Sequence, residues 1–495
     1  RLFLSSALSY PDGGYAARTY ATGSSGGLIG ANAVESTASN VGTVTSYVAD
    51  RTTLVTGDAV DIRATGDSNQ KAESDSNAYG IVAAGGNVSD AVSNVATNAY
   101  LGNGVSLTGA SAIGGLTDGA TYYVVLDSAR PFNPATAVSG NWINLGAGHG
   151  LQTGDSVIYS AAAGNTAVGG LTNGTTYLVE VSGNSVRLKD AATGAVITLD
   201  ASVATGTGHR LDIVNPRQVK LATTFARATA LTPTVINLTA PAVFSTDHSL
   251  TPAQTSVSPP IVFAPATALN ASLDTITVGP SSGLYTGQAV VYSKGDGPSL
   301  SIYAGGEDTN FARSEAGSGG LVAGAGAESN VTATSTTTAA VADDPDKSDG
   351  IRTQMNVASV AIRSEHTARF DSQTDTIQAS AVGFSGSWAT NDVTATVDAK
   401  IGNNALITTR NLTVDAVNTT RKNLLGADEY NVKAGSGGVL QGNAAESETD
   451  IANRTHAIVG SDANITVTGS VYNPGEFRLT AYNDVEGYDD VKLDS

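Results

Sequence analysis

Residues 80–102, which read GIVAAGGNVSDAVSNVATNAYLG, contain the pattern that decides the fold. The segment opens with a glycine and two apolar residues, and it closes 22 positions later at Leu101-Gly102. Between these ends the residues are mostly Ala, Ser, Asn and Val, without the Leu, Lys and Glu spacing of a long helix. A sequence of this composition indicates β-strands.

The pattern of residues 80–102 recurs at three other places in the chain. The copies run from Gly27 to Ala49, from Gly320 to Ala342 and from Gly438 to Gly460. A serine stands nine positions after the first glycine of all four segments, and these serines are Ser36, Ser89, Ser329 and Ser447. A shorter relative follows Trp388 and closes at Ile401-Gly402. Repeats of this kind predict β units that must stack on one another to bury their apolar faces.

Most copies are followed by a second short apolar stretch, such as Leu54-Val55 or Leu406-Ile407. Glycine allows tight corners, and Ala, Ser, Thr and Val suit a narrow interior. The sequence therefore predicts an all-β protein, with β-solenoid-like stacked repeats over residues 1–110 and 306–495.

A different pair of elements occupies residues 111–305. Residues 112–124 (AIGGLTDGATYYV) recur as residues 167–179 (AVGGLTNGTTYLV), and residues 150–160 (GLQTGDSVIYS) recur as residues 283–293 (GLYTGQAVVYS). Asp-Gly or Asn-Gly before a Thr/Tyr/Val run is a signal for a hairpin turn and a strand. These elements predict small inserted β-sandwich or barrel-like modules that interrupt the stacked repeats.

Residues 143–213 contain both elements and are expected to form one complete module. Residues 214–270 hold seven of the 14 prolines, which favours a Thr/Pro-rich connection with edge strands. The stretches 111–130 and 274–303 each contain only one of the two elements. We expect these halves to pair and complete a second module, with Tyr122 and Val290 in one sheet.

The composition excludes several classes of function. The net charge of −19 argues against binding to nucleic acid or to anionic membranes, and no apolar run is long enough for membrane insertion. Without cysteine there are no disulfides, thiolate zinc sites or thiol catalysis. The chain begins at Arg1 without a signal-peptide pattern, which indicates a processed product or a segment of a longer chain.

One acidic loop is a candidate calcium site. Residues 343–350 read DDPDKSDG and contain the four candidate ligands Asp343, Asp344, Asp346 and Asp349. Hard cations take several oxygen ligands from flexible loops, and closely spaced aspartates before a glycine resemble such a loop. The alternative is a solvated acidic turn. No cofactor is required by any motif, and calcium is the single candidate.

Acidic residues at strand spacing are the candidates for an enzyme. Glu446, Glu448 and Asp450 alternate and so share one face of a strand, and Asp392 with Asp398 forms a second pair. Carboxylates on a β-helix face serve acid/base chemistry in polysaccharide lyases and hydrolases, but acidic runs are more often solvated surfaces. We therefore expect no catalytic residues and no enzymatic activity.

The Gly-apolar-apolar repeats that end in Tyr-Leu-Gly or Ala-Ile-Val-Gly resemble the β-strand repeats of giant secreted bacterial surface proteins. Those proteins are adhesins with filamentous-haemagglutinin-like stalks, and the GLxTGDxVxY elements are similar to modules interleaved in them. The resemblance covers most of the chain.

The resemblance implies an extracellular or cell-surface protein. Its role would be that of a structural or adhesive segment of a fibre, sheath or adhesin stalk, without membrane insertion. The expected partners are further repeats of the same chain or further copies of it, together with a cell-surface or glycan ligand. A β-helix carbohydrate-active enzyme and a calcium-dependent surface-layer module are the alternatives.

Overall fold

The computed structural model describes residues 1–495 except 11–13, 110, 231, 244–246, 254–258, 280–281, 296, 427, 470–473 and 495. The chain is all-β and contains large parallel sheets. It divides into two compact units. The first consists of Arg1–Val55, Ala59–Thr108 and Pro298–Ser495, and the second of Thr56–Asp58 and Gly109–Gly297. We call the first the layered unit and the second the inserted unit.

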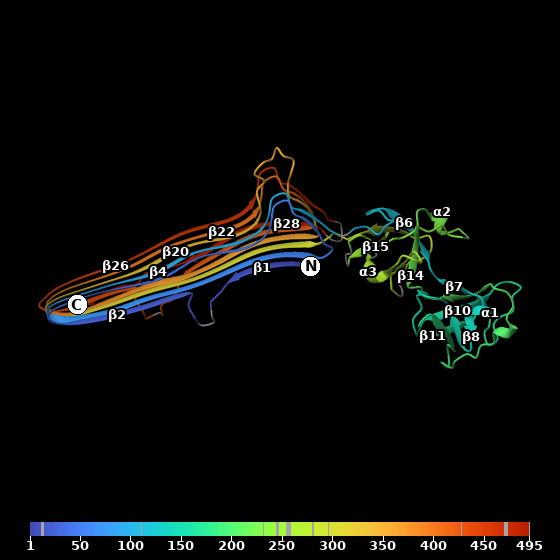
Figure 1. Cartoon of the computed structure of the whole chain (residues 1–495), viewed down its shortest axis with the longest axis horizontal. Helices are drawn as coiled ribbons and strands as arrows, with labels where there is room; N and C mark the ends of the chain where they lie inside the picture. The colour runs from blue at the N-terminus through green and yellow to red at the C-terminus, as the bar shows by residue number, and fades with distance from the viewer. Residues whose placement is uncertain are drawn as a thin grey trace. The chain divides into compact units, whose positions relative to one another are not determined.

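The layered unit is a stack of parallel strands in chain order, and Figure 1 shows the long strands side by side. The first layer contains β1 (Leu2–Leu8) and β2 (Ala17–Val48), and the next three contain β4 (Ala59–Leu101), β20 (Ser299–Val341) and β22 (Ser359–Ile401). The fifth layer contains β24 (Asn411–Lys422), β25 (Val432–Gly437) and β26 (Leu440–Val459). A last layer contains β28 (Glu476–Glu486) and β29 (Val491–Asp494). Each layer pairs in parallel with the next.

A second parallel sheet repeats the same layer order with short strands. It contains β3 (Thr53–Val55), β5 (Ser106–Thr108), β21 (Gln354–Asn356), β23 (Leu406–Thr409) and β27 (Asn464–Val467). The short apolar stretches that follow the repeats in sequence are therefore strands, as expected.

The 43-residue strands fold back on themselves, β4 and β20 at the Gly-apolar-apolar motif and β22 at the equivalent Ser380-Ala381-Val382. In β4 the hydroxyl oxygens of Ser74 and Ser89 lie 2.7 Å apart, although 15 residues of straight strand would span about 50 Å. Thr376 and Ser387 make the same 2.7 Å contact in β22. Each long strand therefore supplies two arms, joined by a bend, that face each other across a narrow interior.

The observed register confirms the repeats that the sequence predicts. Ser36 pairs with Ser89, Ser89 pairs with Ser329, and Ser447 pairs with Ala389 of the shorter copy. These serines point inward, but their main partners are not one another. Ser89 donates to the Arg313 carbonyl at 2.7 Å, so its hydroxyl bonds across the interior to the facing arm of the next layer.

The apolar core of the layered unit is built from columns, meaning residues paired in register through successive layers. One column is Val60, Leu300, Val360 and Leu412, and the next is Ile62, Ile302, Ile362 and Val414. All eight side chains are buried in one cluster. Closer to the bend the interior narrows, and small residues such as Ala72, Ala312 and Ser314 replace the larger ones.

The inserted unit contains two seven-stranded antiparallel sheets. The first has the order β7-β13-β10-β11-β12-β9-β8, and the second has the order β16-β15-β19-β6-β14-β18-β17. The strands of the first sheet are β7 (Ala129–Phe132), β8 (Val138–Ser139), β9 (Trp142–Asn144), β10 (Ser156–Ala161), β11 (Thr176–Ser182), β12 (Ser185–Asp190) and β13 (His209–Ile213). Those of the second are β6 (Thr121–Leu126), β14 (Gln218–Ala222), β15 (His248–Pro252), β16 (Ile261–Phe263), β17 (Leu269–Asn270), β18 (Thr275–Thr277) and β19 (Ala289–Ser293). The short helices are α1 (Pro134–Ala137), η1 (Ala201–Val203), α2 (Phe225–Ala228) and α3 (Pro265–Ala268).

The two predicted half-modules do pair, because Tyr122 of β6 lies opposite Val290 of β19. The two sheets have matching strand orders but different chain orders, so the second module is a circularly permuted copy of the first. Residues 129–213, which form the whole first sheet, are inserted into the second module between β6 and β14. The equivalent position in the first module is its β11–β12 hairpin. A further sequence repeat, FNPATA at 132–137 and FAPATA at 263–268, contains the matching helices α1 and α3.

Two boundaries within the insertion differ from the prediction. The complete module begins at Ala129, because β7 pairs with β13, and not near residue 143. Residues 214–270 are not a connection, since they supply β14 and β15 to the interior of the second sheet. The prolines do not interrupt the sheet. Pro252 is the last residue of β15 and Pro265 is the first residue of α3, and no ladder or helix N–H is lost at either position.

Candidate functional site

Asp343 and Asp344, the first two candidate calcium ligands, lie after β20 and are bound by protein donors. The carboxylate of Asp343 pairs with the Lys400 ammonium, and it also accepts a bond from the Asn403 backbone N–H at 3.0 Å. Burial acts to raise the pKa of Asp343, but these donors lower it below its usual value. Asp344 is buried and accepts a 2.6 Å hydrogen bond from Asn404 Nδ2.

The other two candidates, Asp346 and Asp349, hold the turn together. Asp346 accepts from the hydroxyl and the backbone N–H of Ser348, which lowers its pKa. Asp349 lies 3.3 Å from the Arg51 guanidinium. In the part of the chain that the structure describes, no three His, Asp or Glu side chains gather as a metal site. Calcium binding by this loop stays a prediction.

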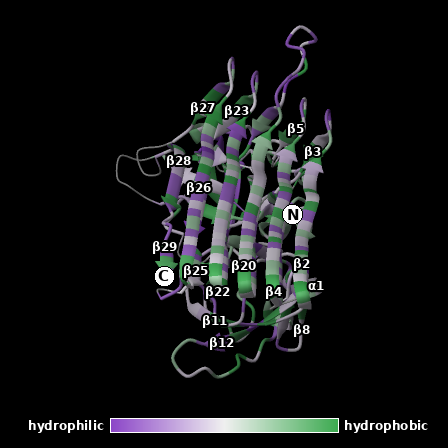
Figure 2. Ribbon diagram, turned by 90° about the vertical axis from the view of Figure 1, so that its left-hand side faces the viewer, coloured by the Kyte–Doolittle hydropathy of each residue, from purple (hydrophilic) through white to green (hydrophobic). Residues whose placement is uncertain are grey.

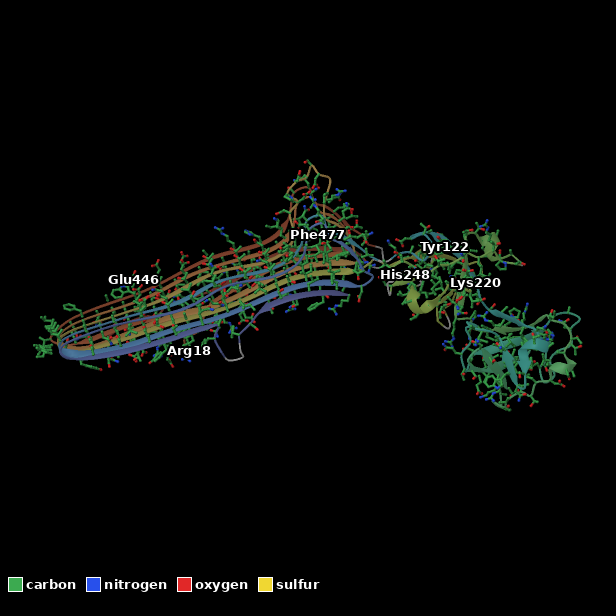
Figure 3. All side chains as sticks on the ribbon, in the orientation of Figure 1. Arg18, Tyr122, Lys220, His248, Glu446 and Phe477 are labelled. Atoms are coloured by element: carbon green, nitrogen blue, oxygen red, sulfur yellow. The ribbon has the colours of Figure 1, made fainter. Side chains whose placement is uncertain are left out.

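The acidic row on β26 has the geometry that its alternation predicts. Glu446, Glu448 and Asp450 are all exposed on the outer face of the strand, and Figure 3 shows Glu446 projecting from it. Asp392 of β22 pairs in register with Asp450 and extends the row to the next layer. Asp398 does not belong to this group, because its carboxylate contacts Nδ1 of His456 at 2.9 Å.

An exposed tryptophan next to the acidic row was not selected by sequence reasoning. Trp388 lies in register between Glu328 and Glu446 and is 42% exposed. A Cβ added to Gly386 would collide with the indole, so the ring lies back over this glycine. The sequence did contain a signal for this site: Trp388, one of two tryptophans, stands in the shorter copy at the position where two other copies have Glu328 and Glu446.

The row of residues beside Trp388 has almost no side chains. Its members, paired in register from β2 to β26, are Ala33, Gly86, Gly326, Gly386 and Ala444. A Cβ on Gly86 or Gly326 would meet no atom within 4 Å, so the surface above them is open. We call this row the glycine trough. It opens into a hollow of about 440 Å³ that Trp388 borders, and a second hollow of about 430 Å³ borders Trp388 and Glu446.

All charged residues that line the two hollows are carboxylates: Glu35, Glu328, Glu446 and Glu448. Asn330 Nδ2 donates to Glu328 at 3.0 Å, but no ion pair to these four is found among the described residues. An aromatic face bordered by carboxylates can stack on a sugar ring and accept bonds from its hydroxyl or ammonium groups. The negative lining disfavours anionic polymers.

One buried charged cluster lies inside the last layers. Lys422 is 1% exposed, contacts the Asp489 carboxylate and donates to Thr449 Oγ1 at 3.0 Å. Burial lowers the pKa of Lys422 to about 8, although Asp371 and Asp490 act to raise it. Burial likewise raises the pKa of Asp371. Lys422 and Asp371 are buried and face the interior, so these two groups hold the layers together and are not open to a ligand.

The two modules of the inserted unit share a tyrosine–histidine pair. Tyr159 lies 2.7 Å from Nδ1 of His209, and Tyr292 lies 2.8 Å from Nδ1 of His248. Each hydroxyl also accepts a backbone N–H, that of Val168 in one module and of Ile113 in the other. In the second module the Tyr292 hydroxyl can donate to Nδ1 of His248 when that imidazole is neutral.

Acidification should destabilise the second module through His248. Burial lowers the pKa of His248 below 6.5, despite the nearby Asp247 and Asp118 carboxylates. Since the unfolded chain then binds the proton more readily, this stabilisation is complete above pH 6.5 and is lost as the pH falls below it. Denaturant unfolding of the full chain between pH 7.5 and 5 should show this loss, and His248→Gln should have a smaller slope. Parallel pH profiles for both proteins would contradict the assignment.

Comparisons with protein-family models, curated proteins and solved structures found no match. Among the described residues, no helix has the length and apolar character needed to cross a membrane.

Proposed function

We propose that the layered unit is a β-solenoid interrupted by two small β-sandwich or barrel-like modules. The protein would be a structural or adhesive segment of an extracellular bacterial fibre, sheath or adhesin stalk. The observation that carries the proposal is that the core columns extend, in register, to both open ends of the stack.

At one end of the stack, the last layer presents core-type residues to solvent. Phe477 and Leu479 pair in register with the buried Leu412 and Val414, yet both are about half exposed. Figure 3 labels Phe477 at this layer. Among the described strands, β28 pairs only with β24, so its outer edge is open.

At the other end of the stack, the first layer also continues the core columns. Leu2 of β1 continues the column of Val60, and Leu4 continues that of Ile62. Open edges of this kind favour pairing with a further strand. The apolar side chains at both ends have the same spacing as the core columns, so a further layer can continue the core at either end. That layer would come from more of the same chain or from another copy.

End-to-end continuation can be tested by charging one edge. The variant Phe477→Lys/Leu479→Lys, here the edge variant, places two ammonium groups where the next layer would pack. We expect the wild-type chain to form longer particles in negative stain as its concentration rises. The edge variant should keep the length of one copy and need at least about a tenfold higher concentration to elongate.

The control variant Phe225→Lys/Val203→Lys changes two exposed apolar residues of the inserted unit and should elongate like the wild type. A wild-type chain whose particle length is independent of concentration would overturn continuation by copies. Equal elongation by the edge variant would show that another surface is responsible.

Trp388 and the glycine trough favour a second function, which is binding of a glycan. We propose a linear polymer of neutral or amino sugars, because the indole supplies a stacking face and the surrounding carboxylates repel polyuronides. This site would give the segment its adhesive property. We expect no turnover of the bound glycan.

Calorimetry with neutral and amino-sugar oligosaccharides tests the glycan site. Trp388→Ala and the trough-filling Gly326→Leu should each weaken binding at least about tenfold, whereas Phe225→Ala should bind like the wild type. Equal affinities for all four proteins would exclude this surface. Released reducing ends or unsaturated products that disappear in Glu446→Gln would instead identify a carbohydrate-active enzyme.

A further inference from the structure

The apolar pair in each Gly-apolar-apolar motif is exposed at the bend. In four layers these side chains are between 41% and 88% exposed: Leu28, Ile29, Ile81, Val82, Leu321, Val322, Val439 and Leu440. The register places the second residue of each pair side by side, in the order Ile29, Val82, Val322, Val382 and Leu440, and the first residue of each pair directly precedes it in the chain. We call these nine residues the bend stripe. Figure 2 shows the hydrophobic colour gathered at this end of the long strands.

The fold itself does not require apolar residues in the bend stripe. Gly80, Gly320 and Gly438 make the close approach between layers, since a Cβ on any of them would collide with a backbone carbonyl of the neighbouring layer. The two residues that follow keep between 41% and 88% of their surface exposed. Together they form a continuous exposed apolar patch, and a patch of this kind on a soluble protein marks an interaction site.

The bend stripe is also uncharged. Residues 24–34, 76–89, 316–327, 376–391 and 434–445, which contain the five bends, include no Asp, Glu, Lys or Arg. The chain as a whole carries a net charge of −19. Like charges therefore repel over most of the surface, but two copies can approach at the bends without opposing charged groups.

We infer that the bend stripe is a lateral association surface and that its occupant is the bend stripe of a second copy. The side chains repeat at the spacing of parallel strands, about 4.8 Å, and another copy presents the same period. A two-fold arrangement lets the same patch serve both partners. The net negative charge argues against an anionic lipid surface as the occupant.

Lateral pairing extends the proposed structural role but does not depend on end-to-end continuation. In a fibre, the same contact would recur in every copy, so weak individual contacts would add along the length. A sheath or a bundled fibre then follows from one repeated motif.

The first test uses the full chain with one charge in each of three layers, Ile81→Asp/Leu321→Asp/Val439→Asp, here the stripe variant. Measured in the presence of the edge variant's two substitutions, which suppress end-to-end elongation, sedimentation equilibrium should show a dimer for the otherwise wild-type chain and at least about a tenfold weaker association for the stripe variant. Its unfolding midpoint should be unchanged, because the replaced side chains are exposed. The control Val41→Asp/Tyr47→Asp/Phe225→Asp alters three exposed apolar residues away from the bends and should dimerise like the wild type.

A second test uses the absence of native cysteine. Leu321→Cys should form a disulfide-linked dimer on mild oxidation, whereas Val41→Cys should stay largely uncrosslinked. The edge variant should still crosslink through Leu321→Cys, and the stripe variant should still elongate end to end, so the two proposals fail independently. Equal association of stripe variant and wild type would overturn lateral pairing. Binding of the wild-type monomer to neutral phosphatidylcholine vesicles, lost in the stripe variant, would replace it with a lipid surface.

Discussion

Ile302→Ala is expected to lower the free energy of unfolding of the layered unit by about 2–5 kcal/mol. Ile302 is fully buried, and it pairs in register with Ile62 on one side and Ile362 on the other. Truncation would leave a cavity between two layers that are fixed by their backbone hydrogen bonds. Denaturant unfolding followed by circular dichroism measures the loss, and hydrogen exchange localises it to the central layers.

The matched control for Ile302→Ala is Leu479→Ala, which truncates the same column in the last layer. Leu479 is 47% exposed in the isolated chain, so its truncation should cost no more than about 1 kcal/mol. Similar losses at both positions would mean that the columns do not form the core, or that the last layer is covered in solution.

Gly320→Ala is the second large effect and should cost about 1–3 kcal/mol. Gly320 precedes the apolar pair in β20, and a Cβ there would collide with the Gly80 carbonyl oxygen of the layer below. Backbone cannot move aside as a flexible side chain can, so the layers must separate at the bend. Thermal unfolding of the full chain should show the loss as a lower midpoint.

Gly326→Ala is the natural comparison, because it makes the same chemical change six residues further along the same strand. Its added methyl would meet no atom within 4 Å, so the expected change is small and can be stabilising. Equal destabilisation by the two variants would show that glycine acts through chain flexibility and not through close contact between layers.

Much of the layered unit could be predicted because its information is local and repeated. The spacing from glycine to serine was sufficient to align the layers, and Ser36, Ser89 and Ser329 are indeed register partners. The pairing of the two half-modules could also be predicted, since similar sequence elements are expected to form equivalent strands. Pairing of Tyr122 with Val290 follows from that reasoning.

The environment of the repeated apolar pair could not be predicted from the pattern. A strand with Leu321-Val322 in its middle looks the same whether those side chains enter a core or project from a bend. The contacts across the interior, such as the 2.7 Å contact between side chains 15 residues apart in β4, show where the chain turns. The candidate sites have the same limitation, since Asp343 binds Lys400 and Trp388 borders Glu328 and Glu446 of the neighbouring layers.

The position of the inserted unit has a consequence for the order of folding. β4 and β20 are neighbours in the stack, yet Val60 and its partner Leu300 are separated by the whole insertion, which leaves at Thr108 and returns at Pro298. If that segment were still unfolded, closing a loop of nearly 190 residues instead of a few would cost roughly 3 kcal/mol in chain entropy. Prior folding of the two modules shortens this loop, so nucleation is favoured among β20, β22 and β24, where connections are short, and docking of β4 comes late.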